Sequence, residues 1–128
     1  MTMKHAFLIM AHGSLPLLRV LLSMLDDERN DIFLHIDRKS DMLDGAEPLV
    51  LSKARLFVLE QRVDVRWGNL SQIKAEYVLF EEALKHGPYA YYHLLSGQDL
   101  PIKSQDYIHQ FFDGHQGKEF VGINLLAC

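Results

Sequence analysis

Short apolar runs and helix-like stretches alternate along this chain of 128 residues. The runs at residues 7–11, 32–36, 56–59 and 90–95 are short and largely apolar, which is typical of buried parallel strands. Strands that alternate with helices predict a parallel sheet with right-handed crossovers. We therefore expect an α/β fold in which these four strands lie side by side in a mainly parallel sheet.

Two long helices are predicted between these strands. Ser14 can cap a helix that holds Pro16 in its first turn, and leucines recur at helical spacing until a polar stretch at 26–30. The second helix begins at Asn69 or Ser71 and ends at the Gly87-Pro88 pair. Its apolar residues at helical spacing, which we expect on one face, are Ile73, Tyr77, Phe80 and Leu84.

Smaller elements are predicted elsewhere. We expect a short helix at 41–46, a small extra strand at 63–65, a helix capped by Ser104 and a last strand at 119–123. The chain then ends on apolar residues, so we expect a domain that is truncated at its C-terminus or that ends against a partner. The apolar residues of the helix after Ser104 are Tyr107, Ile108, Phe111 and Phe112.

Length and composition restrict the class of protein. The chain has the size of a single domain, 1–128, and 48% hydrophobic with 23% charged residues is ordinary for a globular protein. The net charge of -4 argues against a nucleic-acid partner, and no apolar run is long enough for a membrane span. The one cysteine, Cys128, excludes a disulfide framework. The N-terminal apolar run is interpreted as a strand rather than a signal peptide, so we expect a cytoplasmic protein.

Polar clusters follow the predicted strands. Ligands of open α/β sheets bind beyond the carboxyl ends of the strands, so we expect these clusters to converge. After the fourth strand, Gly97 allows close approach of the backbone and Pro101 blocks continuation of the strand. The four clusters are Ala11-His12-Gly13, His35-Ile36-Asp37-Arg38-Lys39, Val65-Arg66-Trp67-Gly68 and Ser96-Gly97-Gln98-Asp99.

The residue types in these clusters suit a nucleotide. Asp37 could accept a hydrogen bond from the N–H of a uracil ring, and Lys39 or Arg38 could lie over the base or meet a phosphate. Trp67 offers a flat wall, with packing in the core as the less favoured alternative. Ser96, with Asp99, could bind sugar hydroxyls. His35 and His93 lie inside strand patterns and are interpreted as core histidines. The histidine spacings do not favour a metal site.

Five segments occur in the order of a known family. They are residues 7–12, 33–40, 65–72, 92–104 and 119–121. On these segments the chain resembles the N-terminal part of the core-2/I-branching β-1,6-N-acetylglucosaminyltransferase family, which also includes the peptide O-xylosyltransferases.

This resemblance implies a GT-A-like (Rossmann-like) three-layer fold with a mainly parallel sheet, truncated at the C-terminus. It also implies a UDP-sugar donor, a carbohydrate acceptor and transfer of N-acetylglucosamine to a hydroxyl with inversion. The family works without a metal, and the sequence agrees, because it contains no Asp-x-Asp motif. No cofactor is expected besides the UDP-sugar substrate.

Site residues carried over from the family all belong to the donor pocket. The uridine pocket is matched by Ala11, His12, Asp37 and Lys39. A segment that contacts the donor is matched by Val65, Arg66, Trp67 and Gly68. The wall beside the sugar is matched by Ser96, Gly97 and Asp99. The family's catalytic acid and its diphosphate-binding basic residues match nothing in this chain. We therefore name no catalytic residue and expect this chain alone to transfer no sugar at a useful rate. We also expect a homodimer that buries the C-terminal end.

Two other functions fit part of the sequence. The turn at 10–14 resembles the His-Gly-Ser turn of the sirohydrochlorin cobaltochelatase family, in which His12 would bind a metal. That interpretation leaves the other three clusters unexplained. The second is a non-catalytic nucleotide-sugar-binding half of a split enzyme.

Overall fold

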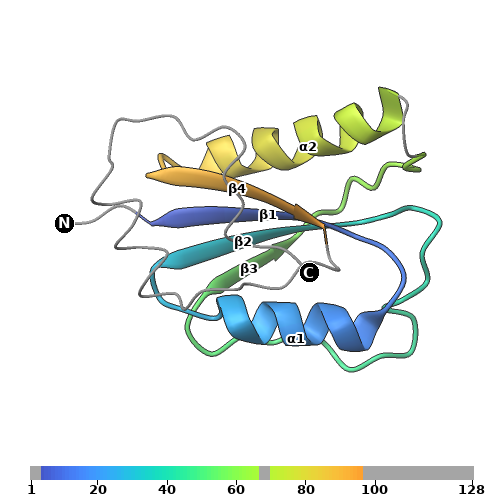
Figure 1. The fold of residues 1–128 in the computed structure, drawn as a ribbon, viewed down its shortest axis with the longest axis horizontal. Coiled ribbons are helices and arrows are strands. Elements are labelled where there is room, and N and C mark those ends of the chain that lie inside the picture. Colours follow the sequence, from blue (N-terminus) through green and yellow to red (C-terminus); the bar gives the residue numbers. More distant parts are fainter. Residues whose placement is uncertain (1–3, 67–69, 97–128) are drawn as a thin grey trace.

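The computed structural model describes residues 4–66 and 70–96, which form a sheet between two helices (Figure 1). The predicted alternation of strands and helices is confirmed. In chain order the elements are β1 His5–Ala11, α1 Leu15–Leu25, β2 Asn30–Ile36, β3 Arg55–Val58, α2 Leu70–His86 and β4 Tyr91–Ser96.

The sheet has the strand order β3-β2-β1-β4, and every neighbouring pair is parallel. From β1 to β2 the chain moves one way across the sheet, and from β3 to β4 it moves the other way. When two right-handed crossovers run in opposite directions across a sheet, their connecting segments lie on opposite faces of that sheet. Accordingly α1 covers one face and α2 the other (Figure 1). The expected three-layer, Rossmann-like α/β fold is confirmed.

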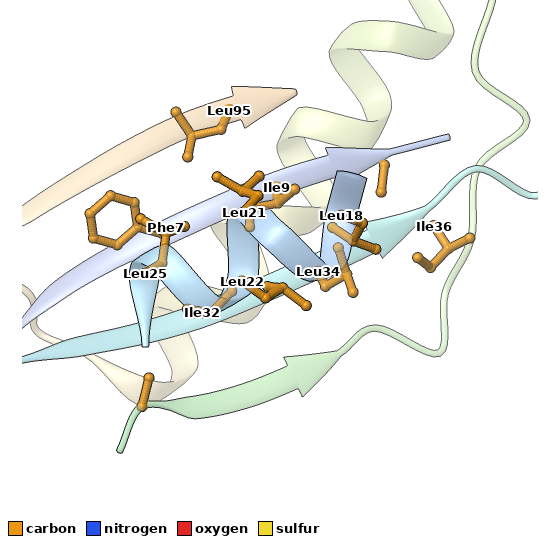
Figure 2. Close-up of a cluster of buried hydrophobic side chains, with 12 residues drawn as sticks. Phe7, Ile9, Leu18, Leu21, Leu22, Leu25, Ile32, Leu34, Ile36 and Leu95 are labelled. Carbon is orange, nitrogen blue, oxygen red and sulfur yellow. The ribbon is translucent and has the colours of Figure 1, made fainter. Parts of the chain in front are cut away.

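Helix α1 packs a leucine face on the sheet, as its spacing predicts. The Leu17 N–H donates to the Ser14 Oγ at 3.3 Å, so Ser14 is the predicted cap. Burial of one such leucine contributes about 1.5–3 kcal/mol, so this layer supplies much of the stability. Figure 2 shows the cluster, whose fully or nearly buried members include Phe7, Ile9, Leu18, Leu21, Leu22, Leu25, Ile32 and Leu34.

Helix α2 approaches the sheet through small residues. Ala75, Leu79 and Ala83 are fully buried against the sheet's second face. The larger apolar residues of α2 share one face, as their spacing predicts, but this face does not pack on the sheet. Periodicity identified the stripe of large residues and could not show that two alanines, which allow a closer approach, form the contact.

Two small predicted elements are wrong. Residues 41–46 form turns instead of a helix, and Gly45 has a φ of +70°, which is left-handed backbone that ends any helical run. Residues 63–65 are not a strand. The Val63 N–H donates to the His35 Nε2 at 2.9 Å, and the Val63 carbonyl accepts from the Arg38 N–H at 3.1 Å. These backbone groups therefore bind a side chain and a loop instead of a strand.

Several predictions lie outside the described residues. They are the helix after Ser104, the strand at 119–123 and burial of the C-terminal end in a homodimer. Neither helix of the described part is long and apolar enough to cross a membrane.

Candidate functional site

A hollow of about 370 Å³ lies at the carboxyl ends of β1 and β2. These strands end side by side, because Ala11 pairs with Ile36. Three chain segments form the walls, and each of them carries a residue predicted for the donor pocket. The lining residues are His12, Gly13, Asp37, Lys39, Ser40, Asp41 and Val65.

Asp37 is the most enclosed polar side chain of this hollow, with 6% of its surface exposed. Its Oδ1 accepts the backbone N–H of Lys39 at 3.0 Å and that of Val65 at 3.4 Å. Burial alone would raise the pKa of Asp37, but these hydrogen bonds and the charge of Lys39 outweigh it and lower the pKa. Asp37 is therefore an ionised hydrogen-bond acceptor at neutral pH.

Lys39 links two of the chain segments that form the hollow by hydrogen bonds. Its Nζ donates to both Asp37 carboxylate oxygens at 3.1 Å, to Asp64 Oδ1 at 2.7 Å and to the Val65 carbonyl at 2.5 Å. The hydrogen bond to Asp64 is the largest of the effects that raise the pKa of Lys39. Since two carboxylates already balance its charge, Lys39 serves first to hold the wall at 63–66 against the loop after β2.

Arg62 is a part of this site that the sequence analysis missed. Its guanidinium donates to the carbonyls of Ile36 at 3.1 Å, Asp37 at 2.8 Å and Ser40 at 2.6 Å. Three carbonyls, one at the end of β2 and two in the loop after it, are thus fixed by a residue more than twenty positions along the chain. No motif marks such an arginine, because its partners are backbone groups.

The remaining predicted residues are placed differently. The Ala11 carbonyl accepts the Asp37 N–H at 2.9 Å, so Ala11 acts through its backbone. The Arg66 side chain is 70% exposed, with a nitrogen 3.7 Å from Asp64. Ser96 is the last residue of β4, opposite Met10. Four further predicted residues, Trp67, Gly68, Gly97 and Asp99, lie outside the described residues.

The two histidines interpreted as core residues lie in or near the core. His35 is fully buried, and its Nε2 accepts the Val63 N–H, whereas its Nδ1 has no partner in the described part of the chain. His93 is half-buried, with its Nε2 3.0 Å from the His5 Nδ1 and its ring stacked on Phe7. Burial lowers the pKa of His35, although Asp37 opposes this shift.

The lowered pKa of His35 predicts a loss of stability in mild acid. The unfolded chain gains a proton on His35 near pH 6.5, whereas the folded protein resists it. The stabilising contribution is thus fully present above pH 6.5 and is lost as the pH falls through the folded pKa. In urea titrations between pH 5 and 7.5, His35→Gln should show less of this loss, because a glutamine side chain does not titrate. Its side-chain carbonyl can still accept from the Val63 N–H, so the variant keeps this hydrogen bond. Equal pH slopes for wild type and variant would contradict the prediction.

Among residues 4–66 and 70–96, no group of three or more His, Cys, Asp or Glu side chains is placed to hold a metal ion. A larger cavity of about 510 Å³ lies between β3 and α2, with lining residues that include Glu60, Val78 and Glu82. None of the polar clusters predicted to bind a ligand contributes to it. The hollow beyond β1 and β2 is therefore the better candidate for the site.

The described part of the chain is thus an α/β domain with a parallel, Rossmann-like sheet, and its polar hollow lies beyond the central strands, where open sheets of this kind bind their ligands. The family model for the Core-2/I-Branching enzyme matches residues 5–124, and the chain thus belongs to this family of glycosyltransferases. None of the curated proteins compared with the chain matches it. The family match spans all four polar clusters, and nothing supports the chelatase interpretation, which used only the first.

Proposed function

We propose that the hollow beyond β1 and β2 binds the uridine part of a UDP-sugar donor. The observation that carries this proposal is the meeting of His12, Asp37, Lys39 and Val65 around one hollow. These residues come from three separate chain segments and were each assigned to the donor pocket by the family resemblance. The family match supports a sugar-transfer reaction, and the proposal assigns the nucleotide of its donor to this hollow.

Asp37 is the residue proposed to recognise the base. Its Oδ2 accepts a hydrogen bond only from the Lys39 Nζ among the contacts of the described residues, so it retains capacity for a further donor. A uracil ring offers one N–H donor. Because Asp37 is ionised and enclosed, a hydrogen bond to it would be charge-assisted and stronger than a neutral one.

The diphosphate needs positive charge that is not already used. Lys39 is balanced by two carboxylates, whereas Arg38 is exposed and Arg66 has one distant partner. Both arginines adjoin residues that line the hollow. We assign them to the diphosphate, where an arginine can donate two parallel hydrogen bonds to phosphate oxygens.

The proposed reaction is transfer of a sugar, N-acetylglucosamine by family resemblance, from UDP to a carbohydrate hydroxyl. Inversion at the anomeric carbon needs a general base for the acceptor hydroxyl and positive charge beside the departing UDP. The arginines proposed for the diphosphate would supply part of that charge without a metal. No residue is assigned as the base.

Titration calorimetry tests this function directly. We test UDP, UDP-N-acetylglucosamine and UDP-xylose with the full chain. Each ligand should bind with the same affinity in EDTA as in manganese chloride. The reason is that protein cations, rather than a metal, are proposed to meet the diphosphate. Strict dependence on manganese would contradict the metal-independent binding, and failure of all three ligands to bind would contradict the donor site itself.

Arg66→Ala should weaken the binding of UDP about fivefold and leave the binding of uridine unchanged. The side chain is largely exposed, so its contact with phosphate contributes on the order of 1 kcal/mol. Lys85→Ala is the matched control, because it removes one exposed positive charge from the C-terminal end of α2. Equal losses for UDP and uridine in Arg66→Ala would assign Arg66 to the base or to the loop instead.

A further inference from the structure

Helix α2 carries an exposed apolar stripe, here called the α2 stripe. Its residues are spaced three and four apart in turn, which is the spacing of a seam between two packed helices. An exposed apolar surface of this kind commonly marks an interface. The stripe consists of Leu70, Ile73, Tyr77, Phe80 and Leu84, which are 80, 56, 71, 36 and 67% exposed.

The α2 stripe faces away from the sheet. Ala75 and Leu79 are fully buried on the side of the helix that packs on the sheet. Because an α-helix has 3.6 residues per turn, Tyr77 lies on nearly the opposite side. One flank of the stripe approaches β4, where the Phe80 ring lies 6.0 Å from the Tyr92 ring. The centre of the stripe is therefore on the outer surface of the α2 layer (Figure 1).

The flank away from β4 carries two opposite charges. Lys74 and Glu81 each directly follow a residue of the stripe, and both are exposed. Glu81 also lines the cavity beside β3. Within the described part of the chain, the ion pairs of α2 join Glu82 to Lys85 and to His86, and they leave Lys74 and Glu81 out. These two charges are thus available to a partner that packs on the stripe.

A second copy of α2 supplies the matching charges when the two helices run antiparallel. In such a seam, each flank of one helix meets the same flank of the other. The register that places Ile73 of one copy opposite Leu84 of the other brings Lys74 beside Glu81. Two-fold symmetry then forms this ion pair twice. The α2 stripe and its flank are therefore complementary to themselves in both apolar surface and charge.

Other ways of pairing the same stripe bring like charges together. In the register above, Glu76 on the second flank faces Ala83, so no charges meet there. An antiparallel register shifted by seven residues would place Lys74 beside its own copy and Glu76 beside its own copy. A parallel pairing would place Glu76 of one copy beside Glu81 of the other. Since like charges disfavour such pairings, the flanks select one orientation and one register.

We propose that two copies of this chain pair through their α2 stripes, antiparallel and in this register. The pairing would cover Ile73, Tyr77, Phe80 and Leu84 of each copy. One helix from each copy forms a small interface, so we expect a dissociation constant on the order of 10 μM. The dimer does not depend on the proposed donor site, because none of the residues that line the hollow belongs to α2.

Exchange of the flanking charges tests the register in the full chain. Lys74→Glu and Glu81→Lys should each weaken the dimer about tenfold, because like charges then meet at both symmetric positions. The double variant should restore the affinity of the wild type to within about threefold, since opposite charges meet again. Lys53→Glu is the control, because it makes the same change of charge at an exposed residue before β3. Analytical ultracentrifugation measures each dissociation constant, and circular dichroism checks that every variant is folded.

Three results would overturn the proposal. A wild-type chain that stays monomeric up to about 500 μM would show that no second copy covers the stripe. A double variant as weak as the single variants would show that Lys74 and Glu81 do not meet. A loss for Lys53→Glu equal to that for Lys74→Glu would assign the effect to net charge.

Crosslinking tests the orientation independently of the charges. In a Cys128→Ser background, Ile73→Cys and Leu84→Cys are made as separate proteins and treated with a short bismaleimide, alone and mixed. The proposed register places these two positions opposite each other, whereas the same position in two copies is roughly 16 Å apart along the seam. We expect a product of dimer mass from the mixture only. No product from the mixture, or as much product from one variant alone, would contradict the antiparallel pairing.

Discussion

Replacement of Asp31 by alanine should lower the free energy of unfolding by about 2–3 kcal/mol. Asp31 is fully buried in β2 and accepts hydrogen bonds from Arg55 Nη2 and from the Tyr89 hydroxyl, both at 2.6 Å. Lys4 Nζ lies 3.3 Å away. The three donors come from before β1, from β3 and from the approach to β4, so one carboxylate links segments far apart in the sequence.

The expected loss comes mainly from Tyr89. This residue is buried, and without Asp31 its hydroxyl would lose its acceptor away from water. The side chains of Arg55 and Lys4 are 55 and 40% exposed, so water can replace their lost partner. The expected loss in the free energy of unfolding is therefore smaller than the 3–5 kcal/mol typical of a fully buried ion pair that loses one member.

The effect of Asp31 should also depend on pH. Burial alone would raise the pKa of Asp31, but hydrogen bonds from Arg55 and Tyr89 and the nearby positive charges outweigh it, and the pKa is lowered. A lowered carboxyl pKa stabilises the fold above the unfolded value, near 4, and this contribution is lost as the pH falls through the folded pKa. The difference in the free energy of unfolding between wild type and Asp31→Ala should thus be smaller at pH 3 than at pH 7.

Urea unfolding at both pH values measures this difference. Asp44→Ala is the matched control, since Asp44 is exposed in the turn after β2 and should change the stability by less than about 0.5 kcal/mol. Because Asp31 lies near the amino ends of the strands, the folded variant should bind UDP as the wild type does. A loss for Asp31→Ala no larger than for Asp44→Ala would show that the network does not stabilise the fold.

Local patterns were sufficient to predict the sheet and to predict that two of the candidate site residues lie close together. The apolar runs that became β1 and β2 are buried on both faces, so they read as continuous stretches, and the rule for carboxyl ends then placed His12 and Asp37 together. Ser14 was predicted as a cap from residue type and position alone, because capping depends on neighbouring residues.

Contacts between distant residues were beyond the same patterns. The residue type of Lys39 suggests contact with the base or a phosphate, yet its Nζ also binds Asp64, which lies 25 positions away. Arg62 binds three backbone carbonyls, and a backbone partner cannot be recognised from the sequence. The contact face of α2 depends on how closely two alanines approach the sheet, which is a property of the packed structure.

Asp37→Ala should weaken the binding of both UDP and uridine by roughly tenfold or more. Loss of one hydrogen bond to an enclosed carboxylate costs about 1–3 kcal/mol. The variant should also lose stability, because the N–H groups of Lys39 and Val65 both donate to the Asp37 Oδ1. A loss of affinity in this variant alone therefore has two possible causes, contact with the base or collapse of the loop, and a second pair of variants is needed to separate them.

Asp37→Asn and Asp64→Ala separate these causes. Asparagine keeps an oxygen for the two backbone N–H groups but places an N–H₂ group where Oδ2 accepts, so the N–H of a uracil ring would meet a donor. Asp64→Ala releases Lys39 from its 2.7 Å partner without touching Asp37. We expect Asp37→Asn to lose nearly as much affinity as Asp37→Ala with less loss of stability, and Asp64→Ala to lose stability with little loss of affinity. Calorimetry and urea unfolding of each variant provide the measurements. If Asp37→Asn binds UDP with the affinity of the wild type, the Asp37 carboxylate stabilises the loop and does not recognise the base.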